Sequence, residues 1–427
     1  MQKGMHFPVW DGGGIIPAGG KPTKNMGLAL ALLVLLSASC TTIPRDPGPE
    51  RADLDFPGTR CADLGGLSFY FTGDAFLRRA EELIREARDY ILIDSFLVNE
   101  DEKGKQVFEL LRARMQQGVR VYLITDASSG FVPGRTGIPF LVRMGIPVAE
   151  FNPMRGSRLA RLPLFVYRDH RKFWIVDGEK ILLGGQNIWT TSLASPEQAG
   201  NTDSMVEFRS AVACRELVEA FVRQWNSYSM DKLHAGDFAV RPGPGTGDSR
   251  AWLVHQDGQA VARQMFSRLF DLAREEIWLI QDYTMPDRAV LRRIRRLSEA
   301  GVRVNILFSG AYSFLDKFHY ATGYRKRALI RAGARLWEYG HPLSHLHYKA
   351  VIVDGQWFGI GSVNFNFRSA WLSKELNLVL EGRDQGQPML ENLAYLASHS
   401  RPITEEEAAG FRGAKYFLYY LLLFLGG

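Results

Sequence analysis

The sequence contains DHRKFWIVDGEKILLGGQN at residues 169–187 and LHYKAVIVDGQWFGIGSVN at residues 346–364. Both stretches carry the pattern His-x-Lys-x4-Asp, followed by a second apolar run, a glycine and an asparagine. The two copies of this pattern comprise His170, Lys172 and Asp177, and His347, Lys349 and Asp354. With the composition of this chain, two matches arise by chance in roughly one of ten thousand sequences. The doubled pattern therefore indicates an internal repeat.

Other segments recur in the same order around these two stretches. Residues 84–96 (IREARDYILIDSF) align with 270–283 (FDLAREEIWLIQDY), and GVRVYLI at 118–124 aligns with GVRVNIL at 301–307. Each half therefore predicts a helix, a strand, a helix, a strand and then a hairpin that turns at an Asp-Gly pair. Alternating helices and strands favour the α/β class, with a mixed sheet flanked by helices in each half.

The segment between the halves is punctuated by Pro and Gly, which is typical of a linker. It covers residues 236–250 and places the boundary near residue 245. We expect one repeat at 51–240 and a second at 241–405. The two copies are expected to face each other across a pseudo-twofold axis, with one active site at their interface.

The first fifty residues are expected to form an export segment and a tether outside the fold. Gly27 to Leu36 is a short apolar run that follows Lys21 and Lys24, and small residues lead from it to Cys40. This is the order of a secretory signal, and the ending Leu-Ser-Ala-Ser-Cys resembles a bacterial lipoprotein signal. We therefore expect lipidation at Cys40 and an exported, membrane-anchored protein on the periplasmic face. An ordinary signal peptide or an uncleaved anchor is the alternative.

The end of the chain, 406–427, is an apolar tail that contains YFLYYLLLFL at 416–425. The apolar run is too short to span a membrane, which takes about 20 residues. It is either a final core element or an interfacial membrane anchor, and the apparent N-terminal anchor favours membrane contact.

The net charge of the chain indicates the class of its partner. The net charge of +6 and the pI of about 9.1 indicate an anionic partner, which is a nucleic acid, a phospholipid headgroup or an acidic membrane surface.

The three cysteines, Cys40, Cys61 and Cys214, have no CxxC spacing, so no structural zinc site is expected. Cys61 and Cys214 either pair in an oxidising compartment or remain buried free thiols.

The spacing of His and Lys within each motif predicts how these two side chains would contact a substrate. Side chains two residues apart on a strand point to the same side, so the His and the Lys of each copy face one way. An imidazole and an ammonium group on one face can address one phosphate together.

These motifs resemble the phospholipase D superfamily and, among its branches, the bacterial cardiolipin synthases. The resemblance runs over about residues 65–382 and includes the tails Gly184-Gly185-x-Asn187 and Gly361-Ser362-x-Asn364. It also includes Arg368-Ser369 and Glu375-x-Asn377, whereas Asn366 stands where that branch usually has Asp. It implies two fused phospholipase D-like repeats and a phosphatidyltransferase that moves a phosphatidyl group between alcohols at a membrane surface.

The resemblance also implies a mechanism without a metal or another cofactor. One histidine attacks phosphorus and gives a phosphohistidine, while the other protonates the departing alcohol and deprotonates the incoming one. By resemblance, His170 is the nucleophile and His347 the general acid. The expected phosphate-binding residues are Lys172, Asn187, Lys349, Ser362 and Asn364.

Four carboxylates complete the expected site. The family orients each catalytic histidine with a carboxylate, and the candidates are Asp203, 33 residues after His170, and Glu375, 28 residues after His347. Asp177 and Asp354 belong to the motif, but a role in bracing the hairpin turn is favoured over proton transfer.

Three alternatives remain open. The same site hydrolyses phospholipid headgroups as a phospholipase D if water outcompetes the alcohol, and the superfamily also includes nucleases. The export signal and the apolar flanks argue against nucleic acid as the partner. A catalytically dead membrane-binding protein is the third alternative, against which both intact motifs stand. The phospholipid substrate and the membrane surface are the expected partners of a chain taken as monomeric.

Overall fold

The computed structural model describes residues 56–131, 137–153, 167–245, 247–310 and 316–426. These residues belong to one compact unit. The predicted export segment and Cys40 lie outside the described residues. Within the described part of the chain, no helix is both long and apolar enough to cross a membrane.

The first repeat is built on a sheet with the strand order β2-β8-β7-β6-β3-β4-β5. Its strands are β2 (Gly65–Thr72), β3 (Tyr90–Ser95), β4 (Arg120–Asp126), β5 (Val148–Phe151), β6 (Lys172–Val176), β7 (Lys180–Gly184) and β8 (Thr202–Arg209). Strands β3, β4 and β5 run parallel, and β3 pairs antiparallel with β6. The sheet is therefore mixed, as predicted.

The second repeat has the same strand order, with one strand added at each edge, as β1-β9-β15-β14-β13-β10-β11-β12-β16. Its strands are β9 (Ala251–Gln256), β10 (Glu276–Gln281), β11 (Arg303–Ser309), β12 (Arg335–Tyr339), β13 (Ala350–Val353), β14 (Trp357–Gly361), β15 (Glu375–Glu381) and β16 (Ser400–Pro402). The remaining strand, β1 (Thr59–Arg60), comes from the start of the first repeat and pairs antiparallel with β9. The matching order, from β2 to β5 and from β9 to β12, is the structural form of the sequence repeat.

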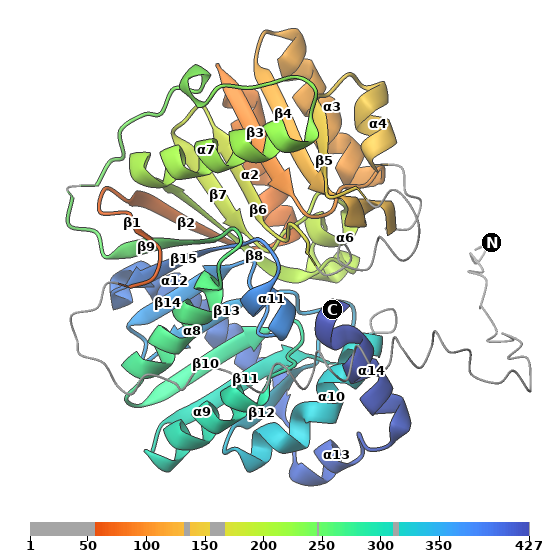
Figure 1. The fold of residues 1–427 in the computed structure, drawn as a ribbon, viewed down its shortest axis with the longest axis vertical. Coiled ribbons are helices and arrows are strands. Elements are labelled where there is room, and N and C mark those ends of the chain that lie inside the picture. The colour runs from red at the N-terminus through yellow and green to blue at the C-terminus, as the bar shows by residue number, and fades with distance from the viewer. Residues whose placement is uncertain (1–55, 132–136, 154–166, 246, 311–315, 427) are drawn as a thin grey trace, which may run out of the picture. The chain divides into compact units, whose positions relative to one another are not determined.

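Helices cover the two sheets (Figure 1). In the first repeat they are α2 (Gly73–Glu86), α3 (Glu102–Gln116), α4 (Gly137–Arg143), α6 (Thr190–Leu193) and α7 (Ala211–Tyr228). In the second they are α8 (Val261–Leu272), α9 (Arg288–Glu299), α10 (Asp316–Arg331), α11 (Phe367–Trp371), α12 (Arg383–Ser398), α13 (Glu405–Ala409) and α14 (Ala414–Gly426). Short 3-10 turns lie at Ala127–Phe131, Pro196–Gln198 and Ala235–Asp237. Side-chain caps begin several of the helices, for example Asp101 before α3 and Asp287 before α9.

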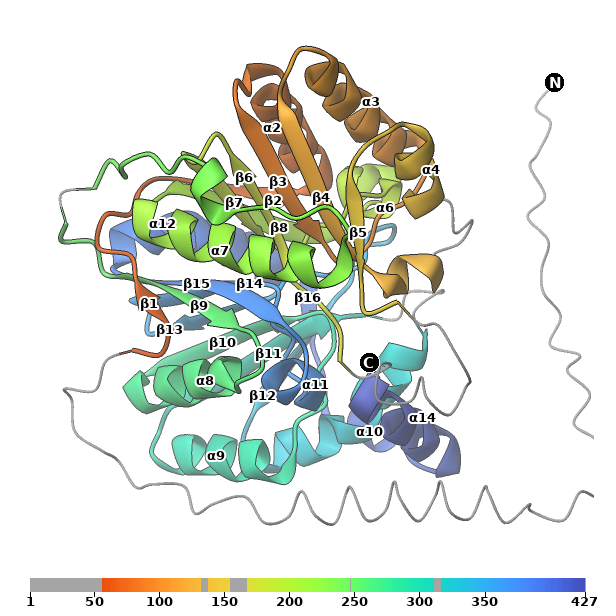
Figure 2. The same ribbon diagram turned by 45° about the horizontal axis from the view of Figure 1, so that its top comes forward.

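The three largest apolar clusters among the described residues hold these layers together. Helices α2 and α3 pack on the outer face of the first sheet, and α8 and α9 pack on the outer face of the second. The largest cluster lies between the sheets, where β6, β7 and α7 of one repeat share a core with β14, β15 and α12 of the other. Both views show the two sheets stacked in this way (Figure 2). This shared core fixes the two repeats against each other and thereby the geometry of anything at their interface.

Each motif strand turns at its Asp-Gly pair, as predicted. Asp177 and Gly178 have φ values of 52° and 64°, and Asp354 and Gly355 have 52° and 60°. Left-handed conformations at two successive residues are typical of tight hairpins, and Asp and Gly tolerate them best.

The two cysteines within the described residues, Cys61 and Cys214, are both free and buried. They lie in the core between the sheets. The alternative of buried free thiols is the one that the structure bears out.

The C-terminal helix α14 lies against α10 (Figure 1). The contact is aromatic, with Tyr320 next to Tyr416 and Tyr324 next to Tyr420, and the Arg325 guanidinium donates a hydrogen bond to the Tyr420 hydroxyl at 2.9 Å. Part of the apolar tail is thus a packed element of the second repeat.

Candidate active site

The two motif strands bring His170 and His347 to the interface between the repeats. His170 precedes β6, and His347 stands three residues before β13. The His170 side chain is 5% exposed and the His347 side chain 16% exposed. Lys172 and Lys349 are fully buried, and each ammonium group donates a hydrogen bond to the carbonyl oxygen of the histidine two residues before it. A hydrogen bond thus fixes the Lys side chain of each motif against the backbone of its His.

Backbone hydrogen bonds join the segment before each motif strand to the other repeat. The amide of His170 donates to the carbonyl of Lys374 at 3.0 Å, and Lys374 donates to Arg168 at 2.8 Å. In the mirror arrangement, His347 donates to the carbonyl of Thr202 at 2.8 Å, and Thr202 donates to His345 at 2.9 Å. Lys374 directly precedes β15 and Thr202 begins β8, so each histidine lies at the start of the equivalent strand of the opposite repeat.

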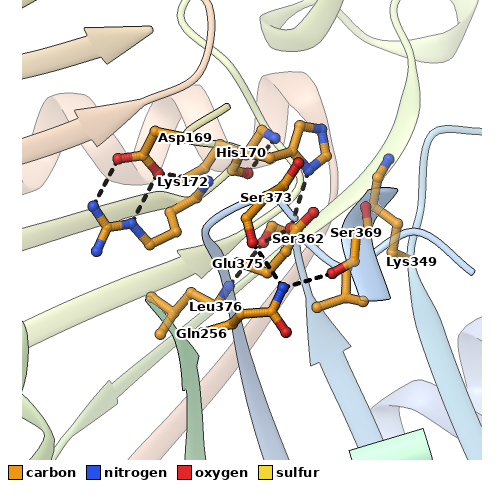
Figure 3. Close-up of polar contacts among 12 residues, drawn as sticks. Asp169, His170, Lys172, Gln256, Lys349, Ser362, Ser369, Ser373, Glu375 and Leu376 are labelled. Atoms are coloured by element: carbon orange, nitrogen blue, oxygen red, sulfur yellow. Dashed lines mark hydrogen bonds and ion pairs between the residues drawn. The ribbon is translucent and has the colours of Figure 1, made fainter. Parts of the chain in front are cut away.

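The candidate carboxylates pair across the interface as a result. Nδ1 of His170 lies 3.1 Å from Oε2 of Glu375, and Nδ1 of His347 donates to Oδ2 of Asp203 at 2.5 Å. Asp203 and Glu375 therefore contact the histidine of the other repeat, not the one that precedes them in their own half. Figure 3 shows His170 and Lys172 beside Glu375 and Ser362, with Lys349 close by. With Nδ1 engaged in this way, Nε2 of each ring is the nitrogen left for chemistry.

The charges at this site influence one another strongly. Burial lowers the pKa of His170 well below its usual value, and Lys172, Arg368, Lys349 and His347 lower it further. Burial likewise lowers the pKa of His347. The crossed contacts place both motifs at the same interface, where Lys349 and His347 lower the pKa of His170. The four motif side chains form one site, not two.

Burial also changes the lysines and a carboxylate. It lowers the pKa of Lys172 to about 7, although Glu375 opposes the shift, and it lowers the pKa of Lys349. It raises the pKa of Glu375 to about 7, although Lys172 opposes the change. An arriving phosphodiester carries a negative charge, which favours the charged form of both lysines. The site is thus suited to bind an anion.

The remaining motif positions differ between the repeats. Ser362 donates a hydrogen bond to Glu375 at 2.5 Å and accepts one from the amide of Leu376 at 2.9 Å, so its hydroxyl supports the carboxylate. The equivalent residue, Gly185, leaves no room for a side chain, because a Cβ there would lie 2.2 Å from Oδ1 of Asp203. The roles of Ser362, Asn187 and Asn364 in phosphate binding stay predictions.

The two asparagines are buried beside the site. Asn187 is 3% exposed and accepts a hydrogen bond from the amide of Leu97 at 3.0 Å. Asn364 is 2% exposed, and its Oδ1 has no hydrogen-bond partner among the described residues. Their equivalent positions after β7 and β14 follow the repeat.

Asp177 and Asp354 lie at the hairpin turns, where each carboxylate ties the turn to the start of a neighbouring strand. Asp177 accepts hydrogen bonds from the amides of residues 88–90, at 2.8 to 3.0 Å, and Asp354 accepts them from the amides of residues 274–276, at 2.7 to 2.9 Å. These contacts account for an acidic residue at this motif position without any proton transfer.

Sequence reasoning missed the residues that follow β3 and β10 at the site. The pairing of β3 with β6 and of β10 with β13 makes Phe96 equivalent to Asp282. The Phe96 ring meets the His170 ring edge-on at 4.8 Å. Asp282 instead places Oδ2 3.8 Å from Nε2 of His347. Phe96 is aromatic and Asp282 is acidic, so a comparison of the two repeats in sequence does not identify either one as a site residue.

A second missed group is a buried ionic network next to the first motif. Arg171 is fully buried and donates to Asp169, Asp94 and Gln224 at 2.6 to 3.0 Å, and its guanidinium lies 2.9 Å from Nε2 of His255. The cation thus joins β3 and α7 of the first repeat to β9 of the second, which makes it part of the interface that holds the site.

The described residues contain no group of three His, Cys, Asp or Glu side chains that could hold a metal ion.

Two repeats that each give one His-x-Lys pair to a common site define a phospholipase D-like protein. The family described as "Cardiolipin synthase, PLD-like domain" matches residues 81–225 and 266–396, one segment in each repeat. The chain belongs to this family, as the doubled motif predicts.

Curated relatives with this name are similar over most of the chain. Cardiolipin synthase of Geobacillus kaustophilus is 25% identical over 338 residues, which cover 76% of this chain and 64% of the relative. Cardiolipin synthase A of Pseudomonas aeruginosa PAO1 is 28% identical over 361 residues, which cover 80% of this chain and 71% of the relative. The chain thus spans less than two thirds of the G. kaustophilus relative.

Solved structures share the fold. The phosphatidylserine synthase of Haemophilus influenzae Rd KW20 superposes with a TM-score of 0.66 at 14% identity, over 87% of this chain and 94% of that one. A polyphosphate kinase from Porphyromonas gingivalis gives 0.53 at 13% identity, over 84% of this chain and 52% of that one. These likenesses confirm the predicted α/β fold with two repeats.

Proposed function

We propose that this protein is a phosphatidyltransferase of the cardiolipin synthase type. The observation that carries the proposal is the pair of crossed contacts, His170 with Glu375 and His347 with Asp203. They hold two imidazoles in one buried site with Lys172 and Lys349, which is the set of groups needed to exchange two alcohols on one phosphorus. The cardiolipin synthases among its relatives support a phosphatidyl donor.

The proposed reaction has two steps. The lone pair on Nε2 of His170 forms a bond to phosphorus, the bond from phosphorus to the departing alcohol oxygen breaks, and that oxygen takes the proton from Nε2 of His347. An incoming alcohol then gives its proton to His347 and bonds to phosphorus, and the histidine–phosphorus bond breaks with return of the lone pair to His170. Lys172 and Lys349 balance the charge on the non-bridging oxygens.

The proposed setting is a membrane surface, with Cys40 as the lipid attachment site on the periplasmic face. The support within the described residues is α14, which has exposed apolar side chains at Phe417, Leu418 and Leu422. This helix packs beside α11, which carries Arg368 of the site (Figure 2). An apolar helix face next to the site suits entry of a lipid substrate from a bilayer.

Lipid product analysis tests the proposal. Purified protein with labelled phosphatidylglycerol should yield cardiolipin and free glycerol in equal amounts. Phosphatidic acid as the sole lipid product would instead identify a phospholipase D hydrolase. Cleavage of DNA with no lipid turnover would identify a nuclease. In all three cases His170→Ala should abolish turnover, so an active His170→Ala variant would contradict the mechanism itself.

A further inference from the structure

We infer that Asp282 is a positioning residue that keeps a proton on Nε2 of His347 and so makes this histidine the general acid. The inference rests on the proposed function and adds to it a physical reason why two equivalent histidines take different roles. It gives a specific task to a residue that lies outside both His-x-Lys motifs.

The Asp282 carboxylate is fixed in place by a neighbouring imidazole. Its Oδ1 accepts a hydrogen bond from Nε2 of His345 at 2.5 Å, and Nδ1 of that ring accepts one from the Ser309 hydroxyl at 2.8 Å. Ser309 accepts in turn from the amide of Leu346 at 3.1 Å. The second oxygen, Oδ2, is left directed at Nε2 of His347, 3.8 Å away.

His347 is thus placed between two carboxylates. Asp203 accepts from Nδ1, and Asp282 faces Nε2, so each ring nitrogen has a negative group beside it. Two carboxylates favour the imidazolium over the neutral ring. Nε2 is also the nitrogen that must deliver a proton to the departing alcohol.

His170 has no such second carboxylate in the position equivalent to Asp282. That position is Phe96, whose ring meets the imidazole edge-on and also lies 4.9 Å from the Lys172 ammonium. An apolar ring and cations favour the neutral imidazole, which is the form that attacks phosphorus. One repeat has a phenyl ring where the other has a carboxylate. This difference therefore assigns the role of nucleophile to His170 and that of general acid to His347.

The charged groups around the two histidines agree with this geometry. The groups that act on His347 are Lys349, Asp203 and Asp282, with His170 and His345 nearby on the adjoining segments. Burial and Lys349 lower the pKa of His347, whereas Asp203 and Asp282 oppose the decrease. For His170, burial and four cationic neighbours all lower the pKa, which falls well below its usual value. These surroundings therefore favour a shared proton on His347 over one on His170.

The carboxylate itself remains ionised. Burial alone would raise the pKa of Asp282, but His345, His347 and Lys349 hold it at about 2. Asp282 therefore stays negative across the pH range in which the histidines titrate.

The test compares two leaving groups in the Asp282→Asn variant. Without a proton, the glycerol oxygen of phosphatidylglycerol would leave as a strongly basic alkoxide, so it needs the proton from His347. A phosphatidyl p-nitrophenyl ester releases p-nitrophenolate, a weak base that leaves without a proton. We expect Asp282→Asn to slow release of glycerol by about tenfold or more, within the range that general acid catalysis contributes. The initial burst of p-nitrophenol should slow by less than about threefold. The alkaline limb of kcat/KM for phosphatidylglycerol should also move to lower pH, because loss of the carboxylate lowers the pKa of His347.

Controls separate this role from a structural one. Glu207, a buried carboxylate that pairs with Arg79 on the outer side of the first sheet, provides the matched variant Glu207→Gln, which should treat both substrates alike. Equal losses on both substrates in Asp282→Asn, or no loss on either, would overturn the inference. Absence of turnover in the wild-type protein on both substrates would instead contradict the proposed function.

Discussion

His347 and Asp203 are 144 residues apart and belong to different repeats, yet Nδ1 of the ring donates to the carboxylate at 2.5 Å. The equivalent contact, between His170 and Glu375, crosses the interface in the opposite direction. Neither repeat alone contains a motif histidine together with the carboxylate that contacts its Nδ1. Each half therefore completes the histidine of the other, so residues of both repeats are needed to build the site.

Enlarging Gly185 should damage the site through Asp203. In Gly185→Ala, the new methyl group would lie 2.2 Å from Oδ1 of Asp203 and push the carboxylate away from His347. We expect kcat to fall by about ten to a hundredfold, since small displacements of catalytic groups have effects of this size. Gly236→Ala is the control, because nothing lies within 4 Å of a Cβ at that position. Steady-state kinetics check this, and a folded Gly185→Ala protein with normal kcat would contradict it.

Replacing Asp177 or Asp354 by alanine should mainly lower stability. Each change removes the acceptor for three backbone amides and places alanine in a left-handed turn. We expect the free energy of unfolding to drop by about 1–3 kcal/mol per site, measured by chemical denaturation. Asparagine at either position should lose less, because it accepts hydrogen bonds and tolerates the turn. A large loss of kcat at unchanged stability would point instead to a direct role in proton transfer.

Binding of the anionic substrate should weaken as the pH rises through about 7. The pKa of Lys172 is lowered to about 7, so this group is charged below that pH and neutral above it in the free enzyme. Loss of a charged hydrogen-bond donor should raise KM by about tenfold. Measurement of KM for phosphatidylglycerol from about pH 6 to 9 checks this, with Lys172→Arg as the comparison because arginine stays charged. A KM that does not change with pH in the wild type would rule out the titration of Lys172 in this range.

The exposed face of α14 should contribute to membrane binding. We expect the triple change Phe417→Ser, Leu418→Ser and Leu422→Ser to weaken binding to phosphatidylglycerol vesicles by about tenfold or more, because each removes exposed apolar area. Cosedimentation measures this in a Cys40→Ser background, in which no lipid anchor forms. The matched control replaces Met230 and Val142, which are also exposed, and should bind as before. Equal vesicle binding by the α14 variant and the control would show that this face does not meet the bilayer.

The repeat and the motif hairpins could be predicted from sequence because their signals are local. Strand periodicity, the Asp-Gly turns and the His-x-Lys spacing all act over fewer than about ten residues. The crossed pairing could not be predicted in this way. It depends on the hydrogen bonds of residues 168–170 with Lys374 and on the core between the sheets, which join segments distant in the sequence.

Asp282 could not be predicted from the sequence, for a different reason. A repeat reveals functional residues where both copies keep them, but this position holds Phe in one copy and Asp in the other. The placement of β1 at the edge of the second sheet was also missed, since two residues carry too little pattern to predict a strand.

The most direct test of the crossed site is the titration of both histidines by NMR in protein labelled with 15N-histidine, with Asp203→Asn compared to wild type. We expect Asp203→Asn to lower the pKa of His347, because a carboxylate that raises it is lost, and to move the Nδ1 resonance of that ring. The Nδ1 resonance of His170 should stay in place and respond instead to Glu375→Gln. A response of His170 to Asp203→Asn, with His347 unaffected, would contradict the crossed pairing.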